Sequence, residues 1–427
     1  MDINNLYKLY LENPSIETDT RKIKEGDIFF ALKGPSFNGN KFAKVAIDAG
    51  ASYCIVDEDT KLINDKIIQV DNSLHALQQL AKKHRQQFNI PFIAITGSNG
   101  KTTTKELIHA VLSSYFKTYT TTGNYNNHIG VPLTILKIKK DAAFAVVEMG
   151  ANHLKEVESY CEYTMPTHGL ITNCGKAHLE GFGSEENIKK AKGELFDYLR
   201  KNNGTAFIFW DYDYLRAMSK GIPNIIKYAE TSTGVEYAGH IRKHNELLEV
   251  FITKGLNINE IDTRLVGGYN LPNVLAAVAV GKTFQVPDEV IKTALSDYMP
   301  SNSRSQLIEK DSNRIVLDAY NANPSSMKVA VENFSLMPGN NKVLILGGMM
   351  ELGAGSIAEH AKLVDLIKES QWQNVVLVGN DFQDIPGEYI HLSNVSEARA
   401  WYRKQGFKNT QVLIKGSRSM QMEQVLE

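Results

Sequence analysis

The chain has 427 residues, a length that predicts about three domains. Hydrophobic residues make up 43% and charged residues 22% of the sequence, as in ordinary soluble globular proteins, and the formal net charge is −1. This balance provides no basic surface for a nucleic acid or an anionic membrane, and no apolar run is long enough to span a bilayer. We therefore expect no nucleic-acid partner and no insertion into a membrane.

The cysteines indicate a reducing compartment. Cys54, Cys161 and Cys174 are odd in number and form no Cys-x-x-Cys pair, which argues against a disulfide framework. Two of them, with His168 and His178, could be imagined as a zinc set, but the spacing matches no common zinc site. The polar, acidic amino terminus is unlike a signal peptide. We expect a cytoplasmic protein.

Residues 1–88 predict a small α/β unit. Apolar runs predict strands at 27–32, 52–56 and 67–70, and a helix follows at 74–85. Polar stretches precede and follow the first strand, with Arg21 in one and Lys33 in the other. They are either surface turns or a pocket for an anionic, sugar-like ligand, in which both cations would pair with the negative charge of that ligand.

Residues 92–104 predict a strand, a tight turn and a helix that together suit a nucleotide phosphate. Asn89-Ile90-Pro91 is a candidate hinge before them. Gly97 and Gly100 allow a sharp turn with backbone N–H groups near the anion, and the helix start adds positive charge. Lys101 can reach the terminal phosphates and the hydroxyl of Thr102 can bind Mg²⁺. The motif is the short form, Gly-x-x-Gly-Lys-Thr, with an isoleucine where the full form has a further glycine.

Polar residues at the ends of later strands extend this candidate site. The amide-rich loop 121–132 is either a turn system or a ligand contact. Glu148 comes directly after the strand 144–147, and His178 follows the strand 169–172. Each could bind a metal at the carboxyl edge of a parallel sheet. Alternatively, Glu148 serves only as a helix cap and His178 is only a packed side chain. The helix 185–199 carries three lysines, and sequence chemistry alone does not choose among Lys189, Lys190 and Lys192.

The remaining chain predicts strands and turns over 205–265, then a helix after Pro272, where Asn273 is either part of a helix start or an adenine contact. Four buried-type strands at 314–318, 342–347, 374–379 and 411–416 alternate with helix-forming segments, which predicts a Rossmann-like parallel sheet. No Gly-x-Gly-x-x-Gly follows any of them, which argues against a dinucleotide site.

Together these motifs resemble the Mur ligases, the ATP-dependent amide-bond-forming enzymes of peptidoglycan precursor assembly. The resemblance covers essentially the whole chain in the family's order, and its segments are 19–21 with 31–34, 97–103, 123–127, 148–153, 177–184, 191–194 and 320–324. It implies an α/β fold of three domains: a small α/β N-terminal domain at 1–88 for a UDP-sugar-peptide, a central ATP-binding domain at 89–301 with a P-loop ATPase-type parallel sheet, and a C-terminal Rossmann-like domain at 302–427 that contacts ATP and the incoming dipeptide.

Within the family, the motifs are most similar to those of the ligase that joins D-alanyl-D-alanine to UDP-N-acetylmuramoyl-tripeptide, and these two substrates are the expected partners of a monomer. MurE, a sister ligase, would show Asp-Asn-Pro-Arg where this chain has Asn-Ala-Asn-Pro at 321–324. MurE and folylpolyglutamate synthase remain alternatives. A nucleotide switch is a distant one, because both Asn-Lys pairs, at 40–41 and 341–342, lack the Asp of a guanine motif.

The resemblance also implies residue roles. The catalytic set would be Lys101, Glu148, His178 and Lys192, with ATP, two Mg²⁺ ions and CO₂, bound as a carbamate on Lys192, as cofactors. The metal ligands would be Thr102, Glu148, His178 and the Lys192 carbamate. ATP would contact Gly97, Ser98, Asn99, Gly100, Lys101, Thr102, Thr103, Asn273, Arg304 and Asp318. The substrates would contact Thr20, Arg21, Lys33, Asn124, Asn126, Asn127, Tyr320, Asn321, Asn323, Lys415 and Ser417. Tyr269 departs from the family, which often has His there, so its side chain receives no role.

Overall fold

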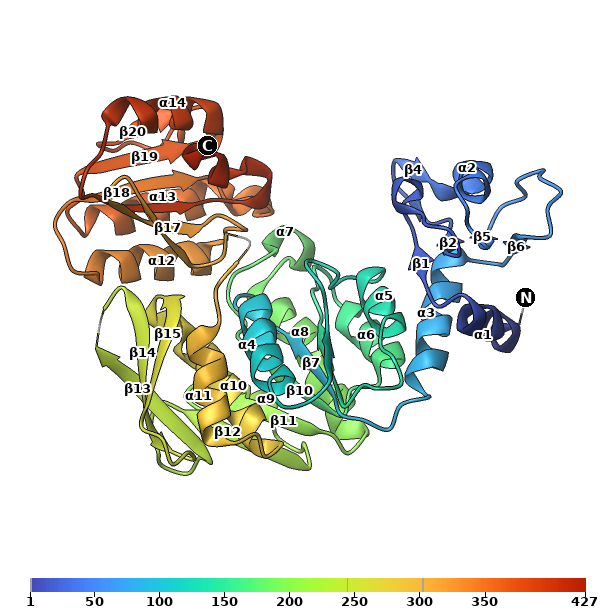
Figure 1. Ribbon diagram of the computed structural model, residues 1–427. Helices are drawn as coiled ribbons and strands as arrows, with labels where there is room; N and C mark the ends of the chain where they lie inside the picture. The colour runs from blue at the N-terminus through green and yellow to red at the C-terminus, as the bar shows by residue number, and fades with distance from the viewer. Residues whose placement is uncertain (1, 244, 302) are drawn as a thin grey trace.

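The computed structural model describes residues 2–243, 245–301 and 303–427, and three α/β units follow one another along the chain. The N-terminal and C-terminal units stand on the central one, at opposite ends of the molecule (Figure 1). Residue 302, with which the predicted third domain begins, lies outside the described residues. Within those residues, no helix is long and apolar enough to cross a membrane.

The N-terminal unit is built on a four-stranded parallel sheet of order β1-β2-β5-β6. One face packs on α2 through small side chains such as Ala43 and Ala46. On the other face, Leu77 and Leu80 of α3 share a core with Phe92 of the central unit, so α3 joins the two units. The elements are α1 (Ile3–Glu12), β1 (Ile16–Glu17), β2 (Ile28–Phe30), β3 (Lys33–Gly34), β4 (Phe37–Asn38), α2 (Ala43–Asp48), β5 (Tyr53–Val56), β6 (Ile67–Gln69) and α3 (Ser73–Arg85).

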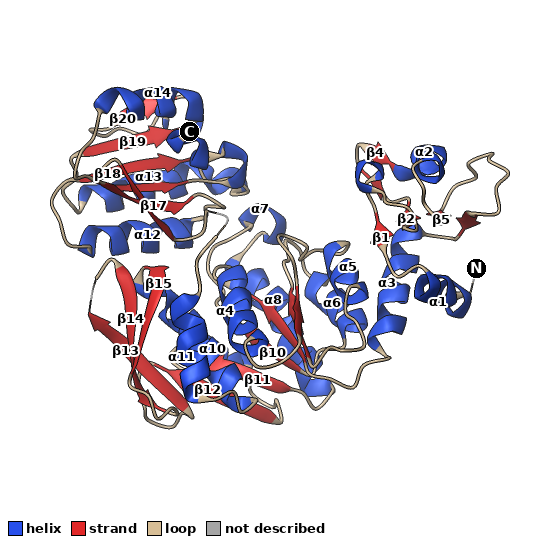
Figure 2. Cartoon of the chain, in the orientation of Figure 1, coloured by secondary structure: helices blue, strands red, loops and turns tan. Residues whose placement is uncertain are grey.

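The central unit has a nine-stranded sheet of order β15-β14-β13-β12-β11-β10-β7-β9-β8. Strands β7 to β13 pair in parallel, as predicted, whereas β14 pairs antiparallel with both β13 and β15 and so extends the sheet. Helices α4 and α10 pack together on one face, and α6 and α8 cover the other (Figure 2).

The central elements are β7 (Phe92–Thr96), α4 (Lys101–Ser113), β8 (Thr118–Thr120), α5 (Gly130–Leu136), β9 (Phe144–Glu148), α6 (Glu156–Thr164), β10 (His168–Ile171), α7 (Leu179–Phe182), α8 (Glu185–Lys201), β11 (Thr205–Phe209), α9 (Asp213–Met218), β12 (Asn224–Ala229), β13 (Tyr237–Lys243), β14 (Leu247–Lys254), β15 (Glu260–Val266), α10 (Leu271–Thr283) and α11 (Asp288–Asp297). Helix α10 begins at Leu271, just before the Pro272 after which a helix was expected, and α5 begins inside the stretch 121–132 expected to be a loop.

The C-terminal unit has a six-stranded sheet of order β16-β17-β21-β18-β19-β20, parallel except for β16. Helices α12 and α13 pack together on one face and α14 covers the other. The elements are β16 (Gln306–Lys310), β17 (Asn313–Asp318), α12 (Pro324–Leu336), β18 (Lys342–Gly347), α13 (Ser356–Lys368), β19 (Asn374–Val378), β20 (Ile390–Leu392), α14 (Val395–Gln405) and β21 (Gln411–Lys415). The four predicted strands are present, and β16 and β20 are added at the two edges.

Candidate active site

The turn between β7 and α4 can be made only with glycine at two positions. Gly97 and Gly100 have φ of +141° and +79°, in the region that side chains rarely adopt. A Cβ at Gly97 would lie 2.0 Å from Oγ1 of Thr172, and a Cβ at Gly100 would lie 2.9 Å from Oδ1 of Asn273. The backbone therefore turns in close contact with its neighbours.

This turn presents positive charge to an anion. Among the described residues, no side chain caps the start of α4, so its first N–H groups and its dipole remain available to a ligand. Lys101 folds back over the turn, and its Nζ donates to the carbonyls of Gly97 (2.7 Å) and Ser98 (3.0 Å). Burial lowers the pKa of Lys101 to about 8; the Glu148 carboxylate opposes that shift and the Arg304 guanidinium adds to it.

Glu148 supplies a carboxylate beside the turn. It ends β9, which pairs with β7 so that Glu148 lies opposite Ile95. Its Oε1 accepts hydrogen bonds from Oγ1 of Thr102 (3.1 Å) and Nδ2 of Asn126 (2.7 Å). Its Oε2 is buried and, among the described residues, has no hydrogen-bond partner. A buried carboxylate oxygen without a donor suits a cation, so this donor set fits Mg²⁺.

The lysine of α8 that points inward is Lys192, which is 1% exposed. Its Nζ donates to the carbonyl of Ala151 (2.9 Å), just beyond β9, and lies 5.0 Å from the ring centroid of Phe182. Burial lowers the pKa of Lys192 to about 7, and the charge of Lys101 adds to the shift. Much of this amine is therefore neutral near pH 7.

His178 connects the central unit to the C-terminal unit. It adopts a left-handed backbone, with φ of +53°, immediately before α7. Its Nδ1 bonds to the carboxylate of Glu351, which follows β18, and the N–H of Glu180 donates to the Glu351 carbonyl (3.1 Å). The His178 hydrogen bond is the main reason that the pKa of Glu351 lies below its ordinary value. No cluster of three His, Cys, Asp or Glu side chains occurs among the described residues, so a metal here would need other ligands as well.

The start of α12 brings the C-terminal unit onto the phosphate turn. Nδ2 of Asn323 donates to Oδ1 of Asn99 (2.7 Å), and Oγ of Ser325 accepts from the N–H of Lys176 (2.8 Å). Lys176 also forms an ion pair with Glu359 of α13 (3.1 Å). The two units therefore share polar contacts directly at the candidate site.

Known proteins match this chain over nearly its whole length. Family models match at residues 14–85 (Mur ligase family, catalytic domain), 95–281 (Mur ligase middle domain) and 303–418 (Mur ligase, glutamate ligase domain). The UDP-N-acetylmuramoyl-tripeptide–D-alanyl-D-alanine ligase of Bacillus subtilis is 33% identical, over 100% of this chain and 97% of that protein. The chain belongs to the Mur ligase family.

Solved structures of the family superpose closely on this chain. MurF from Acinetobacter baumannii has a TM-score of 0.87 at 30% identity, and covers 96% of this chain and 92% of its own. MurF ligase from Thermotoga maritima in complex with ADP has a TM-score of 0.87 at 26% identity, and covers 97% of both chains. The three-unit α/β fold of a Mur ligase, closest to MurF, is thereby confirmed.

The two residues expected to contact the adenine and ribose of ATP lie in different units. Asn273, in the first turn of α10, lies against the phosphate turn: its Oδ1 accepts from Oγ1 of Thr104 (2.9 Å) and its Nδ2 donates to Asn270 (2.9 Å). Asp318 ends β17 and forms an ion pair with Nζ of Lys415 (2.6 Å). Both side chains are thus held by neighbours, and their contacts with adenine and ribose stay predictions.

The expected substrate residues are spread over all three units. In the N-terminal unit, Arg21 pairs with Asp19 on an exposed turn, and Lys33 pairs with Asp57 (3.1 Å). In the amide-rich loop, Asn124 is exposed, Asn126 bonds to Glu148, and Asn127 accepts from the N–H of Gly130, the first residue of α5 (2.9 Å). In the C-terminal unit, Oγ of Ser417 accepts from the N–H of Met350 (2.9 Å), and Nζ of Lys415 donates to the carbonyl of Asn321 (3.1 Å). Thr20, back in the N-terminal unit, begins a short turn after Asp19.

Glu351 was missed by the reasoning from sequence. It lies four residues beyond the buried strand β18, in the loop at the carboxyl end of that strand, whereas Glu148 is the last residue of β9. The rule that polar side chains after parallel strands face the ligand would have selected it.

Proposed function

We propose that this Mur ligase joins D-alanyl-D-alanine to the terminal carboxylate of UDP-N-acetylmuramoyl-tripeptide. The reaction consumes ATP and yields UDP-N-acetylmuramoyl-pentapeptide, ADP and phosphate for peptidoglycan synthesis. The proposal is supported by whole-chain similarity to ligases of that name. The observation that carries it is the glycine turn with Lys101 and Thr102 beside Glu148, whose buried Oε2 has no partner among the described residues.

The chemistry follows from the weakness of a carboxylate as an electrophile. A carboxylate oxygen of the tripeptide attacks the γ-phosphorus of ATP, the bond to the β-phosphate oxygen breaks, and ADP leaves. The amine of D-alanyl-D-alanine then attacks the carbonyl carbon of the acyl phosphate, loses a proton, and phosphate leaves. Lys101 and the N–H groups at the start of α4 hold the phosphates during both steps. Because water would hydrolyse the acyl phosphate, the units must exclude it.

Two Mg²⁺ ions complete the proposed site. Thr102 and Glu148 would hold one, and His178 with a carbamate on Lys192 would hold the other. When bound, the ions neutralise charge on the transferred phosphoryl group.

Lys192 is suited to carbamate formation. A neutral amine attacks the carbon of CO₂ and releases one proton, which leaves an anionic carbamate. With a pKa of about 7, roughly half of Lys192 is neutral at pH 7, against about one in three thousand for an ordinary lysine. The product is an anion, which can bind Mg²⁺, whereas the charged amine would repel the metal ion.

The remaining assignments complete the proposal. Residues 1–88 bind the UDP-sugar-peptide through Thr20, Arg21 and Lys33, residues 89–301 bind ATP, and residues 302–427 bind ATP and the dipeptide. The enzyme acts as a cytoplasmic monomer.

A substrate matrix read by phosphate release tests the function. Phosphate should appear only when ATP, Mg²⁺, UDP-N-acetylmuramoyl-tripeptide and D-alanyl-D-alanine are all present. The alternative substrate pairs are the tripeptide with free D-alanine, the muramoyl-dipeptide with a diamino acid, and folate with glutamate. Phosphate release with any of these pairs, and none with the tripeptide and D-alanyl-D-alanine, would overturn the proposal.

A further inference from the structure

Arg304 lies in a strained segment between the central and C-terminal units. Its two neighbours, Ser303 and Ser305, have φ of +54° and +48°, in the left-handed region that non-glycine residues rarely adopt. Such strain persists only where surrounding contacts determine the backbone, and it gathers at functional sites. The contacts that hold this segment therefore indicate how Arg304 is oriented.

Both serines are held by groups from the two units. The N–H of Ser305 donates to Oδ1 of Asp318 (3.1 Å), and its Oγ hydrogen-bonds with the hydroxyl of Tyr269 (3.0 Å). The carbonyl of Ser303 accepts from the N–H of Tyr320 (3.1 Å). The segment is thus fixed on one side by the turn before α10 and on the other by the residues after β17.

The ring of Tyr320 supports the guanidinium itself. Cζ of Arg304 lies 3.4 Å from the Tyr320 ring centroid, in cation–π contact, and Cζ of Arg418 lies 5.7 Å from the same centroid. Three residues after Tyr320, Nδ2 of Asn323 donates to Oδ1 of Asn99 in the phosphate turn (2.7 Å). The aromatic platform that carries the guanidinium therefore belongs to the segment that contacts this turn.

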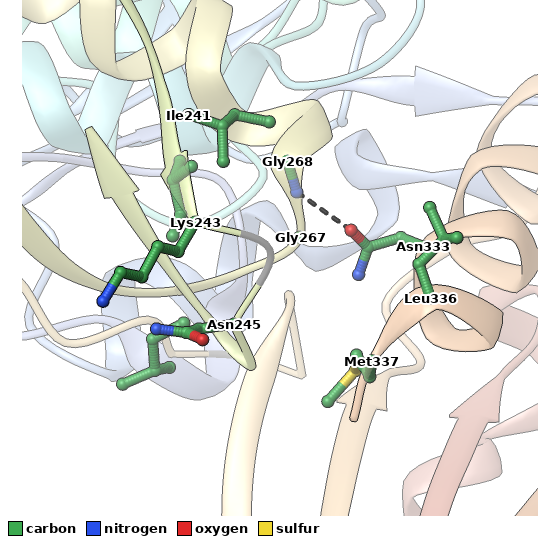
Figure 3. Close-up of a pocket in the computed structure, with 10 residues that line it drawn as sticks. Ile241, Lys243, Asn245, Gly267, Gly268, Asn333, Leu336 and Met337 are labelled. Atoms are coloured by element: carbon green, nitrogen blue, oxygen red, sulfur yellow. Dashed lines mark hydrogen bonds between the residues drawn. The ribbon is translucent and has the colours of Figure 1, made fainter. Parts of the chain in front are cut away.

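Tyr269 is in turn tightly placed. A Cβ at Gly267 would lie 2.3 Å from the Tyr269 ring, so the ring folds over a position that only glycine can occupy. The next residue, Gly268, donates its N–H to Oδ1 of Asn333 in α12 (3.0 Å), and Figure 3 shows this bond across the junction of the two units. The turn that carries Tyr269 is anchored to both units.

We propose that Tyr320 and Tyr269 are positioning residues that hold the Arg304 guanidinium toward the ATP phosphates. This inference depends on the proposed function and on the ATP contact that the resemblance to the family implies for Arg304. An arginine side chain loses much rotamer freedom when it binds phosphate, and a stacked, hydrogen-bonded support removes that freedom in advance. Tyr320 then acts through Arg304 rather than by touching the muramoyl peptide, and Tyr269 acts through Ser305.

The test is a double-mutant cycle with conservative variants. Tyr320→Leu should lower kcat/KM for ATP by about tenfold, which corresponds to 1.4 kcal/mol, and should weaken calorimetric binding of a non-hydrolysable ATP analogue. Tyr320→Phe keeps the ring and should recover most of this loss. In an Arg304→Ala background, Tyr320→Leu should have little further effect on either quantity.

Tyr269→Phe removes only the bond to Ser305, and it should weaken analogue binding while KM for the tripeptide is unaffected. Thermal melting of each variant shows that it has folded. Additive effects in the cycle, or a Phe variant as impaired as the Leu variant, would overturn the inference. Failure of the parent enzyme to release phosphate would instead reject the proposed function.

Discussion

The Lys192 side chain is buried, and its proposed role is to carry a carbamate that binds a metal ion. Lys192→Ala should lower the rate by well over tenfold, which is more than 1.4 kcal/mol of barrier, because the anionic ligand is lost. Added acetate or formate should restore part of the rate by standing in for the carbamate. Phosphate release measures both effects.

The matched control is Lys190→Ala, which removes an exposed lysine of the same helix that forms an ion pair with Glu186 (3.4 Å). It should leave the rate near that of the parent. A Lys192→Ala rate within about threefold of the parent, under 1 kcal/mol of barrier, would show that the assigned role is wrong.

The choice of lysine marks a limit of reasoning from sequence at the residue scale. Lys189, Lys190 and Lys192 are chemically alike, and only the packing of α8 against β10 shows that Lys192 points inward. Glu148 could be predicted, because a carboxylate directly after a buried parallel strand lies at the ligand edge. The roles of Tyr269 and Tyr320 could not, since they depend on contacts between units far apart in the sequence.

At the scale of elements, α3 joins the N-terminal unit to the central one through His84. Its Nε2 donates to the carbonyl of Ile138 (2.8 Å), so its Nδ1 accepts from the Tyr7 hydroxyl (3.1 Å) in the neutral form. Burial lowers the pKa of His84. The unfolded chain therefore binds more protons, and stability is lost as the pH falls from about 6.5 through the lowered folded pKa.

His84→Gln should remove this component of acid sensitivity. The difference in Tm between about pH 7.5 and about pH 5 should be smaller in this variant than in the parent, as measured by differential scanning calorimetry. His75→Gln, at an exposed position of the same helix, should keep the parent's difference. Parallel curves for His84→Gln and the parent would contradict the assignment.

Helix α12 offers a second prediction at this scale. Asn323 caps the helix by accepting from the N–H of Ser326 (2.9 Å) while it donates to Asn99 of the phosphate turn. Asn323→Ser keeps a good cap but is too short to reach Asn99, so it should raise KM for ATP with little change in Tm. Asn323→Ala should raise KM and also lower the stability of the helix by about 0.5–2 kcal/mol.

An unchanged KM in both variants would show that the contact with Asn99 does not matter for ATP. Steady-state kinetics and thermal melting provide the two measurements. The pair separates the contribution of the cap from that of the interdomain contact.

The elements that could be predicted from sequence are those with long apolar runs. Strands β7, β9 and β18 are buried along their whole length and β17 and β19 over most of theirs, and each was expected within a residue or two of its bounds. The edge strands β16 and β20 were missed, because one is half exposed and polar and the other has only three residues. Helix α5 was missed because it begins directly after the amides of a loop, where Asn127 accepts from the N–H of its first residue, Gly130.

At the scale of the whole molecule, the C-terminal unit is docked on the phosphate turn while the N-terminal unit stands at the far end (Figure 1). The ion pair of Arg314 with Glu246 and the contact of Lys176 with Glu359 connect the central and C-terminal units at separate points. Such an arrangement depends on a few polar contacts between units, and no periodicity in the sequence reveals it. The family motifs predicted the three units, but not how they meet.

The central claim is that ATP activates the tripeptide by phosphorylating its terminal carboxylate. The most direct test uses UDP-N-acetylmuramoyl-tripeptide with ¹⁸O in both oxygens of that carboxylate, and mass spectrometry of the released phosphate. The account predicts that each phosphate carries one ¹⁸O, because the oxygen that attacks the γ-phosphorus leaves with it. Unlabelled phosphate, or label recovered in AMP, would contradict the account.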